Sequence, residues 1–377
     1  MGTRLPRESA RDGPAVRACE RCLARAWLVG ALSGHLDHVR GQIAEVLALG
    51  DEQLIAAVGG RRRRELERGL ARFESDSARR GPAESGAEGG VERICRCDPG
   101  YPGRLCSMPS APAVLHVAGG LDRFLALADA DTVAVVGARQ ASSYGAEMAR
   151  SLGRGLAVAG ITVVSGMASG VDSAAHAGAL SVAGPTAAVL PSPADRPYPR
   201  AERALYRQLI RTGAAVSELP AGVAVRRWMF PARNRIIAAL AAMTVVVEAG
   251  AGSGALLTAK FAEQLGRPIG AVPGRVTTAQ AVGPNRLLVE GAHVVRGAQD
   301  VLDAVFGAGA RSLPSDDRPE LEPEQRALLR AIANGHDTPA ALSRAGIGLE
   351  QGLAALATLE LSGYIRREPG GRFAVVP

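Results

Sequence analysis

The sequence is poor in the residues on which several protein classes depend. It holds one lysine, Lys260, and five cysteines among 377 residues. Five cysteines are too few for a disulfide-built domain, so we expect a reducing compartment, the cytoplasm. The longest strongly apolar run, 236–247, is shorter than the roughly 18 residues of a membrane span, and residues 1–13 lack the apolar stretch of a secretory signal. We therefore expect neither a membrane protein nor a secreted disulfide scaffold.

Two nucleotide-binding fingerprints are also missing. No GxGxxG precedes an acidic residue about 20 positions later, and no GxxxxGK[ST] is present, so the usual signatures of dinucleotide redox enzymes and of NTP hydrolases are absent. The 44 basic and 37 acidic residues permit a polyanionic partner without requiring one. Aromatic residues make up only 3%, which leaves few rings for stacking on bases: Tyr144, Tyr198, Tyr206, Trp228 and Phe230.

Composition and periodicity divide the chain into five segments. Residues 1–80 predict a small helical accessory domain, and 81–110 predict a linker and approach segment. Residues 111–306 predict a Rossmann-like domain, and 307–322 a polar linker rich in Pro, Gly and Asp. In 323–377 three helical patterns precede two short strands, an order typical of a winged helix. The third of these helices carries no basic residue, which favours a protein-interaction or regulatory role over groove reading.

The central segment repeats a short apolar run about every 25 residues, the length of one strand and one crossover helix. This spacing predicts an α/β fold with an open, mainly parallel sheet covered by helices on both faces. The expected strands are 132–136, 161–164, 186–190, 214–217, 243–247, 268–271 and 292–295.

Loops of small residues follow these strands at the edge where an open parallel sheet binds its ligands. Backbone N–H groups in such loops suit phosphate oxygens, although a glycine after a strand also serves packing alone. Taken together the loops predict a polyphosphate or sugar-phosphate ligand. The residues that we expect at the site are Gly137, Arg139, Ser165, Gly166, Gly252, Ser253 and Gly254.

Two further segments place arginines beside aromatic rings, the composition of a groove for single-stranded nucleic acid. The first contains Arg200 and Arg203 after Tyr198. The second, WMFPARNRII, adds Phe230, Arg233, Asn234 and Arg235. In the alternative interpretation the rings pack in the core and the arginines are solvated or ion-paired.

The order of VGARQASSYG, VVSGMASGVDSAAHAGAL, YPRAERAL, SELPAG, FPARNRIIAAL, VVEAGAGSGALLTA, AVPG and GPNRLLVEGA resembles the DNA-processing protein A family, DprA or Smf. The resemblance covers 111–306, and many members also carry a winged helix. It implies a non-enzymatic protein without a cofactor. Such a protein binds single-stranded DNA in natural transformation, helps load the recombinase RecA, and forms homodimers through the Rossmann-like domain.

By the same resemblance, Arg139 contacts DNA phosphate, and basic residues after the Tyr-Pro motif, here Arg200 and Arg203, do likewise. The Ser165-Gly166 loop and the FPxRNR segment would line the same pocket. The sequence departs from the family pattern at three places. Ser169 replaces a usual arginine, Pro191-Ser192-Pro193 replaces a GTG-type turn, and Glu202 replaces an asparagine.

Other residues leave alternatives open. A nucleotide or nucleoside-phosphate hydrolase would use the same pocket with Glu248 or Asp172 as base, whereas Glu248 could instead orient arginines. We interpret His176, in a small apolar helix, as structural.

The cysteines also allow two interpretations. Cys19-x-x-Cys22 and Cys95-x-Cys97 could form a four-thiolate zinc site, but the second spacing is tighter than usual and Cys106 is left over. The sequence therefore favours reduced thiols and no metal.

Overall fold

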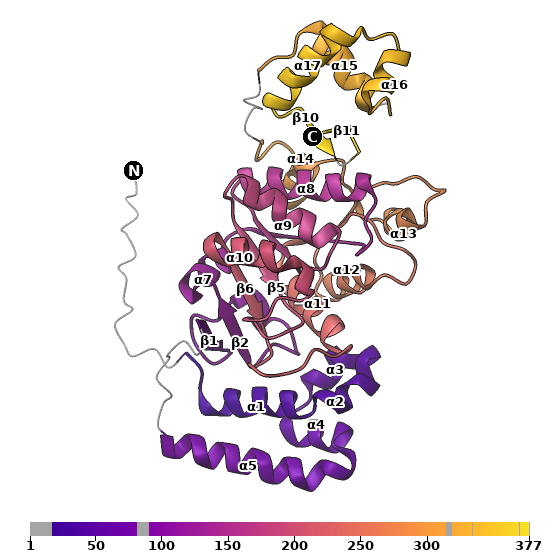
Figure 1. Ribbon diagram of the computed structural model, residues 1–377. Helices are drawn as coiled ribbons and strands as arrows, with labels where there is room; N and C mark the ends of the chain where they lie inside the picture. Colours follow the sequence, from indigo (N-terminus) through magenta and orange to yellow (C-terminus); the bar gives the residue numbers. More distant parts are fainter. Residues whose placement is uncertain (1–16, 81–89, 314–318, 334, 369, 377) are drawn as a thin grey trace, which may run out of the picture.

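The structure is a computed structural model that describes residues 17–80, 90–313, 319–333, 335–368 and 370–376 (Figure 1). Residues 1–16, which include the start considered for a secretory signal, and residues 81–89 of the expected linker lie outside the described residues. Among the described residues, no helix has both the length and the apolar composition of a membrane span.

Short runs of β-branched and small apolar residues form the centre of a nine-stranded sheet. In β3 (Thr132–Val136), Ala134 and Val136 belong to the core on one face, while Val133 and Val135 belong to the core on the other. Because both faces are buried, four consecutive apolar residues can follow Thr132 in this strand.

The sheet has the order β1-β2-β6-β5-β4-β3-β7-β8-β9, and its strands from β6 to β9 pair in parallel. This confirms the expected mainly parallel α/β sheet. Both boundaries of each expected strand lie within one residue of the boundaries of an observed strand. After β3 these strands are β4 (Thr162–Ser165), β5 (Thr186–Val189), β6 (Ala214–Ser217), β7 (Met243–Val246), β8 (Ile269–Ala271) and β9 (His293–Val294).

The approach segment differs from the sequence expectation. Residues Val91–Cys95 form β1, which pairs antiparallel with β2 (Val114–Ala118), and β2 pairs antiparallel with β6. The segment therefore supplies an edge strand of the sheet. The charged residues Glu92 and Arg93 conceal this strand in the sequence. Both are partly buried, and Glu92 Oε2 accepts from the backbone N of Leu121 at 2.6 Å.

Helices cover both faces of the sheet. One layer contains α8 (Ser143–Val158), α9 (Val171–Ser181), α10 (Arg203–Thr212) and α14 (Ala298–Phe306). The other contains α6 (Gly103–Cys106), α7 (Leu121–Asp129), α11 (Met229–Leu240) and α12 (Gly254–Gln264). Glycines allow α8 and α9 to approach closely, because a Cβ at Gly153 would lie 2.1 Å from the carbonyl oxygen of Ala175. The remaining elements of this region are η3 (Arg200–Glu202), η4 (Ala279–Ala281) and α13 (Val282–Val289).

The amino-terminal helices pack against the loop before α11 and its first turns (Figure 1). Trp228 is completely buried among them, its indole Nε1 donates to Ser33 Oγ at 3.3 Å, and its backbone N donates to Asp37 Oδ1 at 3.0 Å. The helical region thus shares one core with the Rossmann-like region. Its elements are α1 (Glu20–Ala31), α2 (Ser33–Leu36), η1 (Asp37–Gln42), α3 (Ile43–Ala48), α4 (Asp51–Val58), η2 (Gly60–Arg62) and α5 (Arg63–Arg80).

The carboxyl-terminal region has its own core, built around Leu328, Leu359 and Phe373. Its elements follow the expected order of three helices and a hairpin: α15 (Pro323–Ala333), α16 (Pro339–Arg344), α17 (Leu349–Leu361), β10 (Ile365–Glu368) and β11 (Arg372–Val375). The assignment of this region as a winged helix stays a prediction. Part of the expected linker is ordered against α14, because Leu313 N donates to Gln299 Oε1 at 3.0 Å, whereas residues 314–318 lie outside the described residues.

Trp228→Ala should lower the free energy of unfolding by about 3–5 kcal/mol, because it opens a cavity in the core that joins the two regions. Chemical denaturation followed by circular dichroism would measure the loss. Trp27→Ala is the matched control, since Trp27 is only partly buried at the edge of the same core and should cost less. Equal losses for the two variants would contradict the shared core.

Candidate nucleic-acid interface

The carboxyl ends of β3, β4 and β7 meet at one edge of the sheet, where the strand order reverses on either side of β3. A cavity of about 650 Å³ opens at this edge. We call it the crest cavity. The predicted site residues that line it are Gly137, Arg139, Phe230, Arg233, Asn234, Ser253 and Gly254.

Arg139 lies exposed in the loop after β3, with its guanidinium carbon 4.7 Å from the centroid of the Phe230 ring. The Tyr198 ring meets Phe230 edge to face, with 5.4 Å between centroids. A guanidinium over an aromatic face is partly oriented before a ligand arrives, and its N–H groups stay free to bind anions. Tyr206 and Trp228, also considered for stacking, are buried in cores.

Two further arginines at the crest cavity were not singled out from the sequence. Arg40, in η1 of the amino-terminal helices, and Arg227, just before α11, are both exposed and line the cavity. Arg227 directly precedes the segment WMFPARNRII and could have been found there. Nothing in the local sequence around Arg40 indicates its position, because it reaches the cavity only through the packing of the helical region.

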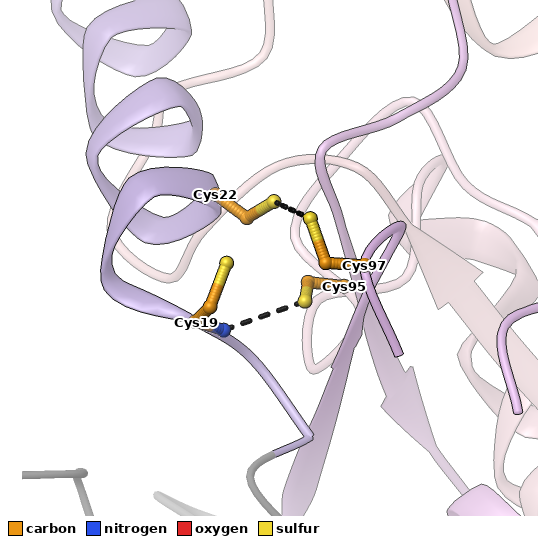
Figure 2. Close-up of side chains that lie close together, drawn as sticks. All are labelled: Cys19, Cys22, Cys95 and Cys97. Carbon is orange, nitrogen blue, oxygen red and sulfur yellow. Dashed lines mark hydrogen bonds between the residues drawn. The ribbon is translucent and has the colours of Figure 1, made fainter. Parts of the chain in front are cut away.

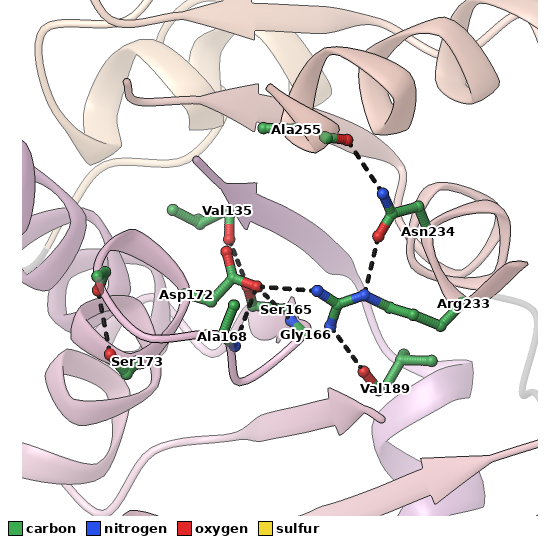
Figure 3. A network of polar contacts seen from close by, with 12 residues as sticks. Val135, Ser165, Gly166, Ala168, Asp172, Ser173, Val189, Arg233, Asn234 and Ala255 are labelled. Carbon is green, nitrogen blue, oxygen red and sulfur yellow. Dashed lines mark hydrogen bonds and ion pairs between the residues drawn. The ribbon is translucent and has the colours of Figure 1, made fainter. Parts of the chain in front are cut away.

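Arg233 lies beneath the cavity at the centre of a buried polar network (Figure 3). Its Nη1 donates to the Val189 carbonyl at 3.0 Å, and its Nε donates to Asn234 Oδ1 at 2.8 Å. Asn234 Nδ2 in turn donates to the Gly254 carbonyl at 3.0 Å. We call this set, completed by Asp172, the Arg233 network. It connects the loop after β4 and the end of β5 with α11 and the start of α12.

Asp172 supplies the counter-charge in this network. Its Oδ2 lies 3.5 Å from Arg233 Nη2 and accepts from the backbone N atoms of Gly166 at 3.2 Å and Ala168 at 3.4 Å. Burial raises the pKa of Asp172, and the Arg233 guanidinium and these amides act in the opposite direction. The carboxylate therefore serves an internal ion pair, which argues against Asp172 as a general base.

Three predicted site residues are placed differently from expectation. Arg235 does not line the cavity: it is 2% exposed, and its guanidinium is held by Glu218 and the Ser110 carbonyl. Ser165 is fully buried and its Oγ donates to the Val135 carbonyl at 2.6 Å. Gly166 is buried beside the network, where a Cβ would collide with the Arg233 guanidinium. Ser165 and Gly166 thus lie beneath the cavity, whereas Arg235 faces away from it, toward Glu218 and Ser110.

The remaining predicted residues are exposed outside the lining of the crest cavity. Arg200, in η3, and Arg203, the first residue of α10, follow the loop after β5. Gly252 is exposed in the loop before α12, next to Ser253, whose Oγ caps that helix by accepting from Ala255 N. All three therefore lie near the same edge of the sheet.

Glu248 and His176 have structural partners. Glu248 is buried and accepts from Ser142 N at 2.9 Å and from Ser142 Oγ at 2.5 Å, so it anchors the start of α8 and contacts no arginine there. His176 Nδ1 lies 2.7 Å from Thr186 Oγ1, and burial lowers the pKa of His176 to about 3. A neutral histidine in this position agrees with the structural interpretation.

The family model of DNA recombination-mediator protein A matches residues 92–306, more than half of the chain. The chain belongs to this family. Protein Smf of Synechocystis is 33% identical over 313 residues, which cover 73% of this chain and 78% of that protein. The match begins at β1, in agreement with the structural finding that this strand is part of the sheet.

Two solved structures are also similar. DNA processing protein A from Streptococcus pneumoniae is 29% identical, with a TM-score of 0.59 over 76% of this chain and 96% of that chain. DNA processing protein A from Helicobacter pylori, whose structure concerns a single-stranded DNA binding mode, is 26% identical. Its TM-score is 0.52, over 57% of this chain and 95% of that chain.

Asp172→Ala should destabilise the protein by about 3–5 kcal/mol, because it leaves the Arg233 guanidinium buried without a counter-charge. The double variant Asp172→Ala/Arg233→Met removes that buried charge and should recover part of the loss in urea unfolding. Strict additivity of the two single substitutions would show that the ion pair does not couple these residues.

Proposed function

We propose that the protein binds single-stranded DNA by its phosphates at the crest cavity and delivers the strand to RecA, without cutting or converting it. The observation that carries the proposal is the convergence of Arg40, Arg139 and Arg227 on one cavity beside the half-buried Phe230 ring. Guanidinium groups pair with phosphate, and a ring offers a face to an unstacked base. The single-stranded DNA binding of the Helicobacter pylori relative supports the same ligand class.

The bound DNA strand follows the exposed basic residues. Arg200 and Arg203 extend the positive edge beyond Tyr198, and the amino terminus of α12, with Ser253 and Gly254 at its mouth, adds backbone donors. Binding of this kind reads the backbone and little of the base sequence. Arg235 and Ser165 are left out of the contact surface because both are covered.

A hydrolase at the same site is less well supported. Its two candidate bases, Asp172 and Glu248, are both buried and committed to internal hydrogen bonds. Incubation with nucleoside monophosphates should therefore release neither base nor phosphate.

The protein acts in the cytoplasm as a homodimer that recruits RecA. Exposed valines near the last strand of the sheet, Val282, Val289 and Val294, supply an apolar surface that a second copy would cover. Light scattering of the wild type and of Val289→Asp tests the dimer.

Assembly of RecA on DNA coated with single-strand-binding protein, with and without this protein, tests the loading step.

Arg139→Glu should weaken binding to a labelled thymidine oligonucleotide by about 100-fold or more, because it replaces a phosphate-pairing charge with a repelling one. Fluorescence anisotropy would measure the affinity, and circular dichroism would verify the fold. Arg211→Glu is the matched control: this exposed arginine sits in the last turn of α10, at the opposite edge of the sheet. Equal effects of the two substitutions would remove Arg139 from the site.

Ser169→Arg should increase affinity, since Ser169 adjoins the cavity-lining Ala168 where the family pattern has an arginine. One added phosphate contact should steepen the plot of log affinity against log salt by about 0.7. Titrations of the wild type and this variant at several salt concentrations give both slopes. An unchanged slope with unchanged affinity would place the DNA path elsewhere.

A further inference from the structure

Four cysteine sulfurs from two distant parts of the sequence meet at the junction of the helical region and the sheet (Figure 2). Cys19 and Cys22 lie at the start of α1, Cys95 is the last residue of β1, and Cys97 lies in the turn that follows. All four Sγ atoms are within 4.8 Å of one another. Cys106, the fifth cysteine, is not part of this cluster.

The size of the cluster fits one tetrahedral metal ion. Zinc–sulfur bonds of about 2.3 Å place the four thiolates of a Zn(Cys)₄ site about 3.8 Å apart. The Sγ atoms of Cys22 and Cys97 are 3.6 Å apart, close to that edge length and well beyond a disulfide bond. A cluster with several iron atoms would spread its thiolates over a wider shell.

The backbone explains how the tight Cys95-x-Cys97 spacing becomes compatible with such a site. Asp98 N donates to the Cys95 carbonyl at 2.9 Å, which closes a turn directly after β1. The turn carries Cys97 back toward α1, so both thiols of the pair face Cys19 and Cys22 (Figure 2). Judged by spacing alone, Cys95-x-Cys97 argues against zinc, because zinc knuckles usually place at least two residues between their cysteines.

The backbone around the sulfurs suits thiolates that are bound to a metal. Cys19 is the N-cap of α1 and Cys22 lies in its first turn, where the helix dipole stabilises negative charge. The backbone N–H of Cys19 donates to Cys95 Sγ at 3.3 Å, a hydrogen bond that would offset thiolate charge. Cys22 and Cys95 are buried with Ala26 and Val114, whereas the exposed Cys97 leaves the ion a way in.

We propose that these four thiolates bind one structural Zn²⁺ ion. Zinc with four thiolates has no open position for water, so the site holds structure and performs no catalysis. Binding Zn²⁺ releases the four thiol protons and involves no oxidation or reduction. The ion would tie α1 to the edge strand β1, across 75 residues of sequence, and so help to fix the helical region that carries Arg40.

Metal analysis of the full-length protein, produced in zinc-supplemented medium and purified under reducing conditions, tests the proposal. We expect about one zinc per chain in the wild type and in Cys106→Ser, and below about a tenth of that in Cys97→Ser. Cys97 is the thiol to remove because it is exposed, so its loss disturbs packing least. Cys97→His, which restores a ligand, should recover zinc binding.

A second measurement is independent of expression conditions. Metal-free wild type and Cys106→Ser titrated with Co²⁺ should develop the visible and near-ultraviolet bands of tetrahedral cobalt thiolate. Cys97→Ser should not develop the bands of four-thiolate coordination. Chelation should lower the melting temperature of the wild type and leave that of Cys97→Ser unchanged.

Several results would overturn the proposal. These are zinc below about a tenth of an equivalent in the wild type, equal zinc in Cys97→Ser and Cys106→Ser, iron in place of zinc, or a Cys22–Cys97 disulfide in protein kept under reductant.

Discussion

The ion pair between Arg233 and Asp172 is the contact on which the crest cavity depends. Arg233 has only 7% of its surface exposed, so its guanidinium must satisfy its donors inside the protein, and it does so on the Val189 carbonyl, on Asn234 and on Asp172. Val189 ends β5, Asp172 lies at the start of α9, and Asn234 passes the network on to the Gly254 carbonyl at the start of α12. The cost of leaving any of these groups unpaired therefore fixes the loops relative to one another.

This arrangement divides the arginines of the site between two tasks. Arg233 and Arg235 are covered and hold the frame, whereas Arg40, Arg139 and Arg227 are exposed and free to meet a ligand. The two buried residues lie two positions apart on α11, about 200° around the helix, so they cannot face the same surface. Arg233 turns toward the strand ends and Arg235 toward Glu218 and Ser110. A motif with two arginines thus supplies two anchors on opposite sides of one helix.

The parallel strands and the edge of the sheet proposed to bear the site follow from the sequence, because doubly buried strands are continuously apolar and open parallel sheets bind ligands at their strand ends. The exposed position of Arg139 agrees with its place in a turn. The local sequence does not indicate whether an arginine is buried. Arg235 differs from Arg139 only through the acceptors that the folded chain places around Arg235. β1 was missed because charged residues occupy two of its five positions, and Arg40 because it reaches the cavity through contacts made far along the chain.

Two sets of contacts bind the helical region into the rest of the molecule. Trp228 enters its core from the loop before α11, and the two cysteines at the start of α1 meet the two at the end of β1 and in the turn after it. Arg40 lies three residues after Asp37 in η1, and the Asp37 carboxylate accepts from Trp228 N. Asp37 and Arg40 lie on either side of a kink at Val39, so the contact that seats the tryptophan holds the segment that brings Arg40 to the cavity. A region that composition presents as an accessory domain is therefore part of the wall of the site, and its stability and the geometry of the cavity depend on the same contacts.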